Sequence, residues 1–214
     1  MEYHTLDHRA EDRFVEKKSE FIGNAAPVRN EEEALAFLNE VRRKYPDARH
    51  HVYAYRLREM GTTRFSDDGE PQGTGGKPVL NVLERQQLTD CVVVVTRYFG
   101  GILLGTGGLV RAYGHGASLA VRAAEPISMI QCSELSIACD YAQYGKLQGV
   151  VLEQGGLIDD TLFTDGVELI VSMPQDRVEG LRALLTDLTC GSVEPVHRRD
   201  KWQKFSIFTQ MEEE

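Results

Sequence analysis

Two glycine-rich segments hold the residue types in this sequence that could do chemistry. The tetrapeptide GTGG occurs at 73–76 and again at 105–108, each time just before a run with helical spacing. A glycine-rich turn that opens a helix presents free backbone N–H groups and the positive end of the helix dipole, which together suit a phosphate. We therefore predict a phosphate site built from Gly73, Thr74, Gly75, Gly76, Lys77, Arg97, Tyr98, Gly105, Thr106, Gly107, Gly108 and Arg111.

The cations and rings beside these turns indicate what would carry the phosphate. Arg97 and Arg111 have planar guanidinium groups that match phosphate oxygens bidentately, and Tyr98 with Phe99 could stack on a base. This combination favours RNA. The named nucleotide motifs do not fit, because Pro78 stands where a P-loop needs Ser or Thr and LGTGGLV lacks the third glycine of a dinucleotide fingerprint.

Acidic residues in the first segment leave several interpretations open. Asp67, Asp68 and Glu70 either cap the loop and pair with the arginines, or converge on a hard cation such as magnesium beside a phosphate. In an enzyme for a small phosphorylated metabolite or nucleotide, one of them would be a base or a metal ligand. The sequence identifies no catalytic residue.

A second basic stretch lies near the C-terminus, with a tryptophan among its cations. It resembles a nucleic-acid contact strip, although an exposed edge strand protected by charge has the same composition. Its residues are Arg198, Arg199, Lys201, Trp202 and Lys204.

Composition limits the classes of function. The chain has 214 residues and a net charge of −9, which argues against a protein that coats nucleic acid through bulk electrostatics. The acidic excess lies in the C-terminal part, so a basic protein partner is a third interpretation. No Cys or His spacing predicts a metal site, and we expect no cofactor. Without a signal peptide or a long apolar run, we expect a cytoplasmic protein with no membrane segment.

The elements that would position these residues follow from periodicity, and they predict an α+β protein of two domains, 1–128 and 129–214. In the first, CVVVVT at 91–96 predicts a strand buried on both faces, 61–76 a long loop, and Gly114 and Gly116 close packing of a helix. The second predicts a ferredoxin-like βαββαβ order. Its expected elements are strand 129–139, helix 144–153, strands 157–163 and 167–173, helix 177–189 and strand 192–199.

The segments FSDDGEPQGTGGKP and VVVVTRYFGGILLGTGGLVRAYGHGA together resemble the motifs of the Impact family, in its bacterial YigZ-type form. The resemblance implies an N-terminal domain like the second domain of a small-subunit ribosomal protein, a fold shared with the fourth domain of elongation factor G and with GHMP kinases. The C-terminal part is similar to the family's domain of unknown function and to the fifth domain of elongation factor G.

The resemblance also implies a place in translation. Eukaryotic relatives regulate translation by competing for the activator of a starvation-sensing kinase, but they carry a further domain that this sequence lacks, so that partner is not inherited. We therefore expect an RNA- or ribosome-associated protein. The family's motif positions are Asp67, Asp68, Gly69, Glu70, Gly73, Gly76, Pro78, Arg97, Tyr98, Gly100, Gly101, Gly105, Gly107, Gly108 and Arg111.

Overall fold

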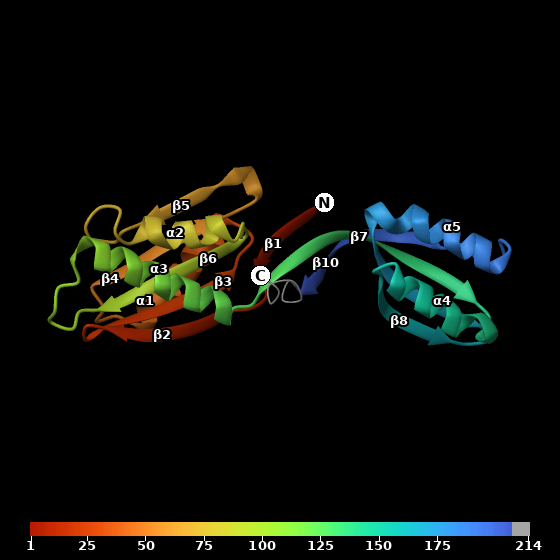
Figure 1. The fold of residues 1–214 in the computed structure, drawn as a ribbon, viewed down its shortest axis with the longest axis horizontal. Coiled ribbons are helices and arrows are strands. Elements are labelled where there is room, and N and C mark those ends of the chain that lie inside the picture. The colour runs from red at the N-terminus through yellow and green to blue at the C-terminus, as the bar shows by residue number, and fades with distance from the viewer. Residues whose placement is uncertain (207–214) are drawn as a thin grey trace. The chain divides into compact units, whose positions relative to one another are not determined.

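The computed structural model describes residues 1–206 and has a mixed α+β fold with antiparallel pairing and five α-helices among those residues (Figure 1). The chain divides into two compact units. Residues 3–128 form one, and residues 129–205 with residues 1–2 form the other. No helix in the described part combines the length and the apolar character that a bilayer crossing requires.

The N-terminal unit is built on a five-stranded sheet with the order β2-β3-β6-β4-β5. The strand pairs β2–β3, β3–β6, β4–β6 and β4–β5 are all antiparallel. The central strand β6 is buried on both faces as predicted, because Val92 and Val94 enter one hydrophobic cluster and Val93 and Val95 the other. The strands are β2 (Ala10–Glu16), β3 (Ser19–Pro27), β4 (His50–Arg56), β5 (Thr63–Ser66) and β6 (Cys91–Tyr98).

Helices cover both faces of this sheet. Helix α1 (Glu31–Lys44) packs on one face, and α2 (Gly76–Arg85) with α3 (Gly105–Ala123) packs on the other. Asn30 caps α1 by accepting a hydrogen bond from the Glu33 backbone N–H at 2.9 Å, as the sequence predicted. The face of α1 that meets the sheet carries Ala34, Phe37, Leu38 and Val41.

A pair of glycines brings α3 very close to strand β3. A Cβ at Gly23 would overlap the backbone carbonyl oxygen of Gly116, so the strand has no room for a side chain there. A Cβ at Gly116 would lie only 3.1 Å from Val95 Cγ1. The predicted close packing is therefore confirmed at Gly116. It is wrong at Gly114, where a Cβ would meet no atom within 4 Å.

The C-terminal unit has the predicted βαββαβ order. Strand β7 pairs with β9 and with β10, and β9 pairs with β8, while α4 and α5 pack on the sheet through one hydrophobic cluster. Leu135, Leu169 and Leu181 lie at its centre, each fully buried. The elements are β7 (Pro126–Cys139), α4 (Tyr141–Glu153), β8 (Leu157–Phe163), β9 (Val167–Pro174), α5 (Val178–Thr189) and β10 (Val196–Ser206).

Two strands were not expected from the sequence. Strand β1 (Glu2–Leu6) pairs with β7, and β5 occupies part of the segment that we predicted to be a continuous loop at 61–76. The last strand also begins later than predicted, at Val196.

Candidate functional site

The first glycine turn is held from inside by the side chain of Asp67. Its Oδ2 accepts a hydrogen bond from the Gly73 N–H at 2.8 Å, and its Oδ1 accepts from the N–H groups of Gly75 at 2.9 Å and Gly76 at 2.8 Å. The Thr74 N–H donates to the Pro71 carbonyl at 3.0 Å. Burial acts to raise the pKa of Asp67, but the three backbone donors outweigh it and hold the pKa below the ordinary value.

These bonds correct the prediction for this turn. We expected its N–H groups to point outward to a phosphate, but a carboxylate of the same loop already occupies the anion position. The Asp67 carboxylate thus occupies the position that a bound phosphate would take. Of the interpretations that the sequence left open for the acids, loop capping is the one that applies to Asp67. Lys77 beside the turn is exposed and pairs with Glu84 at 3.2 Å.

Glu70 and Arg97 form a buried ion pair below the turns. Arg97 Nη1 donates to Glu70 Oε1 at 2.7 Å, and the Tyr113 hydroxyl of α3 donates to the same oxygen at 2.7 Å. The two charged side chains are only 7% and 4% exposed. We predicted that Arg97 would bind a phosphate. In the structure its guanidinium instead compensates the buried Glu70 carboxylate, so it is not available to a phosphate.

Asp68 connects the same loop to α1 and β4. Its Oδ1 accepts from Arg42 Nη2 at 3.1 Å, and its Oδ2 accepts from the backbone N–H of His51 at 2.6 Å. With Asp67, Asp68 and Glu70 each engaged by different partners, the three acids do not converge on a cation. Within residues 1–206, the acidic and histidine side chains that lie close enough together to share a metal ion are Asp7, His8 and Glu125, outside the glycine-rich segments.

The second glycine turn differs from the first, because it lies open. Helix α3 begins at Gly105 without a side-chain cap and with no acidic residue in its first turn. Within residues 1–206, nothing accepts the N–H groups of Gly105, Thr106 and Gly107, and all three residues are exposed. This turn keeps the features that the sequence predicted for a phosphate site.

Arg111 lies over this open turn. Its Nη1 is 3.6 Å from the position that a Cβ of Gly107 would take, so the guanidinium folds back one helical turn toward the start of α3. Arg111 is exposed and forms no ion pair within the described part of the chain. A cation and the free N–H groups therefore meet at one surface.

Exposed apolar side chains precede this turn in the sequence. In the loop before α3, Phe99 is 53% and Leu103 is 82% exposed, and half-buried Tyr98 precedes them at the end of β6. A Cβ at Gly100 would overlap the backbone of Lys18, so this loop packs against the turn between β2 and β3. An exposed ring and a long apolar side chain in the segment that leads to this turn are residue types that can contact a planar base.

The basic C-terminal stretch is neutralised within its own sheet. Arg198 pairs with Glu168 at 2.7 Å, Arg199 with Glu134 at 3.0 Å, and Lys201 with Glu134 at 2.9 Å. Hydrogen bonds from Arg199 and Lys201 lower the pKa of Glu134 to about 2. The remaining members of the stretch, Trp202 and Lys204, also have partners. The predicted nucleic-acid strip is therefore not a free basic surface. This favours the alternative interpretation, an exposed strand protected by its charges.

One feature of the N-terminal unit has no sequence motif. His51 and Arg42 line a common cleft between α1 and β4, although they are nine positions apart and no metal or nucleophile spacing connects them. Alternation along β4 indicated only that at most one of His50 and His51 would face a site.

Two family models match separate parts of this chain. Residues 17–121 match the model of the Impact N-terminal domain, and residues 137–192 match a domain of unknown function, DUF1949. The chain is 39% identical over 181 residues to "IMPACT family member YigZ" of Escherichia coli K12, covering 83% of this chain and 89% of that protein.

Two further relatives give the same result. "IMPACT family member in pol 5'region" of Thermus thermophilus is 40% identical over 177 residues, which is 82% of this chain and 96% of that protein. A solved structure described as "Crystal structure of an hypothetical protein" superposes with a TM-score of 0.58 at 35% identity, covering 92% of this chain and 98% of the other. The chain therefore belongs to the Impact family, together with its bacterial members such as YigZ.

Proposed function

We propose that this protein is a cytoplasmic RNA- or ribosome-associated protein that influences translation, and that it binds backbone phosphates at the N-terminus of α3. One observation carries the proposal: Arg111 lies over a helix start whose N–H groups at Gly105, Thr106 and Gly107 have no partner in the described chain. A phosphodiester there would accept from these N–H groups and from the guanidinium, at the positive end of the helix dipole.

RNA fits the site better than a small phosphorylated metabolite does. The acids that an enzyme would use as base or metal ligands, Asp67 and Glu70, are engaged by backbone donors and by a buried arginine. The loop that precedes α3 instead carries Phe99 and Leu103, which are open to solvent and could receive unpaired bases. These features support binding rather than catalysis.

The fold is compatible with this proposal. Membership of the Impact family agrees with a translation-associated regulator, and the βαββαβ order fits the ferredoxin-like domain that we propose for the C-terminal unit. For the N-terminal unit we propose the fold of the ribosomal-protein and elongation-factor domains that the sequence motifs imply. Fold analogy alone assigns no function, so the test addresses the turn.

A charge placed in the turn tests the proposal. Thr106→Glu puts a carboxylate in the first turn of α3, where it interacts favourably with the helix dipole but occupies the phosphate position. We expect binding to purified ribosomes or structured RNA to weaken by about tenfold or more without a fall in melting temperature. The isosteric control Thr106→Gln should retain binding. Equal affinity of the two variants would exclude this turn as the binding site.

A further inference from the structure

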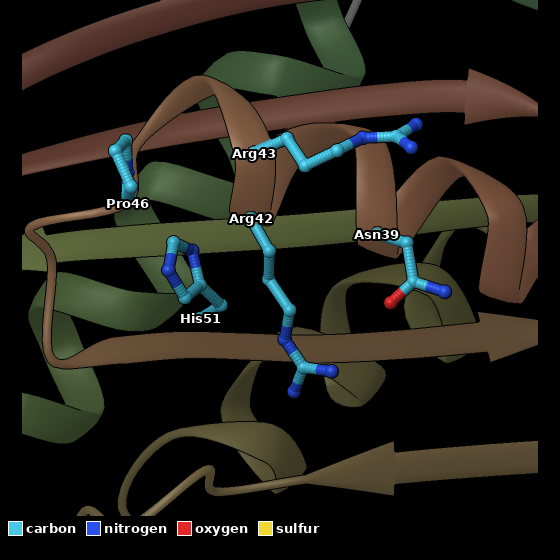
Figure 2. A pocket seen from close by; sticks show the side chains of 5 residues that line it. All are labelled: Asn39, Arg42, Arg43, Pro46 and His51. Carbon is cyan, nitrogen blue, oxygen red and sulfur yellow. The ribbon is translucent and has the colours of Figure 1, made fainter.

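A cleft of about 620 Å³ lies between the C-terminal end of α1 and strand β4, on the opposite face of the sheet from α3. Its lining residues are Asn39, Arg42, Arg43, Pro46 and His51 (Figure 2). No carboxylate belongs to this lining. A cleft of this size accommodates a small organic ligand, and its lining selects for negative charge.

His51 contributes a buried donor to the cleft. The side chain is 6% exposed, and its Nδ1 lies 3.0 Å from the hydroxyl of Thr96 on the neighbouring strand. Burial lowers the pKa of His51, so the ring is neutral near pH 7. When Thr96 donates to Nδ1, Nε2 carries the proton, and this N–H has no acceptor within residues 1–206. Because Nε2 is not fully enclosed, a ligand in the cleft can accept this hydrogen bond in place of solvent.

Arg42 is fixed beside this histidine. The Asp68 carboxylate holds the Arg42 guanidinium at 3.1 Å and the His51 backbone N–H at 2.6 Å, so one acid places both residues. Figure 2 shows Arg42 reaching from α1 across the sheet, with the His51 ring between it and Pro46. Only one of the guanidinium nitrogens of Arg42 is bound by Asp68, which leaves other donors for a ligand.

Arg43 provides the charge that Asp68 does not neutralise. It forms no ion pair in the described part of the chain and is exposed, and Figure 2 shows it extending along α1. With Arg42 balanced by Asp68, Arg43 gives the cleft a net positive charge. Its long side chain can turn toward an anion that binds between Arg42 and His51.

We propose that this cleft is a phosphate subsite, in which Arg42 and the His51 Nε2–H donate to the phosphate oxygens and Arg43 closes over it. The inference goes beyond the proposed function, because it concerns other residues on the other face of the sheet. The phosphate belongs either to a small molecule or to the RNA backbone, and the probes distinguish these sources.

The test is a titration of the whole protein followed by amide NMR shifts, with inorganic phosphate, adenosine 5′-monophosphate and a short RNA without terminal phosphates as probes. We expect phosphate to shift the signals of Arg42, Arg43 and His51 in a saturable way. Tighter binding of the mononucleotide than of the RNA identifies a small molecule as the source, and the reverse identifies the RNA backbone. His51→Asn, which retains a group able to bond Thr96 but lacks Nε2, should weaken binding about tenfold.

Arg43→Gln gives a second variant whose folding is not in question, since the side chain is exposed. Its control is Arg122→Gln, because Arg122 lies in the last turn of α3 as Arg43 lies in the last turn of α1. We expect Arg43→Gln to weaken phosphate binding at least about threefold and Arg122→Gln to leave it unchanged. Equal effects of the two variants, or no saturable shift in the unmodified protein, overturn the proposal. Thr106→Glu should leave this phosphate binding intact, which separates it from the site on α3.

Discussion

The carboxylate of Glu70 and the guanidinium of Arg97 form an ion pair 2.7 Å long in the interior of the N-terminal unit, on the α3 side of the sheet. The two residues belong to different glycine-rich motifs and are 27 positions apart in the sequence. The pair joins the loop before α2 to the end of β6, and Tyr113, in the middle of α3, donates to the same Glu70 oxygen. The two motifs therefore form one structural unit, and of its two turns the second is the one whose N–H groups are free.

Glu70→Ala should strongly destabilise the N-terminal unit. It leaves the buried Arg97 charge without its partner and the Tyr113 hydroxyl without its acceptor, which costs about 3–5 kcal/mol. Urea unfolding followed by circular dichroism measures the loss. Fluorescence of Trp202 reports on the C-terminal unit and should change little. The control Glu84→Ala breaks the exposed pair with Lys77 and should cost less than about 1 kcal/mol; similar losses for both variants would contradict a structural role of the pair.

Alanine substitutions at Gly23 in β3 and at Gly114 in α3 should change the free energy of unfolding in opposite directions. Gly23→Ala places a Cβ against the Gly116 carbonyl, and the helix must move away from the strand, at a cost of about 1–3 kcal/mol. Gly114→Ala meets no atom within 4 Å and should stabilise the helix by up to about 1 kcal/mol. The midpoints of urea unfolding should therefore shift in opposite directions. A shift in the same direction would refute the close approach at Gly23.

Acidification should destabilise the N-terminal unit through His51. Burial lowers the folded-state pKa of this ring below the ordinary histidine value of 6.5, so the unfolded chain binds the proton more readily. The stability contribution of the neutral ring is full above about pH 6.5 and falls as the pH drops toward the folded pKa, with a slope of at most about 1.4 kcal/mol per pH unit. Urea unfolding of the protein and of His51→Asn across pH 5–8 measures the difference. The difference in unfolding free energy between the protein and His51→Asn should narrow as the pH falls. A constant difference would show that the pKa of His51 is the same in the folded and unfolded states.

Most of the fold follows from local patterns in the sequence. The run of valines at 92–95 predicted a strand covered on both faces, and the spacing of Ala34, Phe37 and Val41 predicted the buried face of α1. Strand β5 was missed because its four residues, TRFS, have no clear alternation and are exposed or half-buried. Its pairing with β4 comes from backbone contacts that no local pattern records. Strand β1 pairs with a segment more than 100 positions away.

The sequence located the two candidate glycine turns, but it did not predict which of their N–H groups are hydrogen-bonded within the protein. Glycines before a helix indicated free N–H groups at both turns, and this holds at Gly105–Gly107. At the first turn, Asp67 accepts from residues six to nine positions later, a spacing outside the usual capping motifs. Composition alone does not reveal whether an acid turns into its own loop or toward solvent. The same limit applies to Lys201, whose partners Glu134 and Asp159 come from other strands.

The salt dependence of RNA binding by Arg111→Gln tests the central claim most directly. If Arg111 neutralises one backbone phosphate at the start of α3, the slope of log affinity against log salt should decrease by about one in this variant. Arg122→Gln, at the other end of the same helix, should keep the slope of the unmodified protein. An unchanged slope for Arg111→Gln, or an equal decrease for both variants, would contradict phosphate binding at this turn.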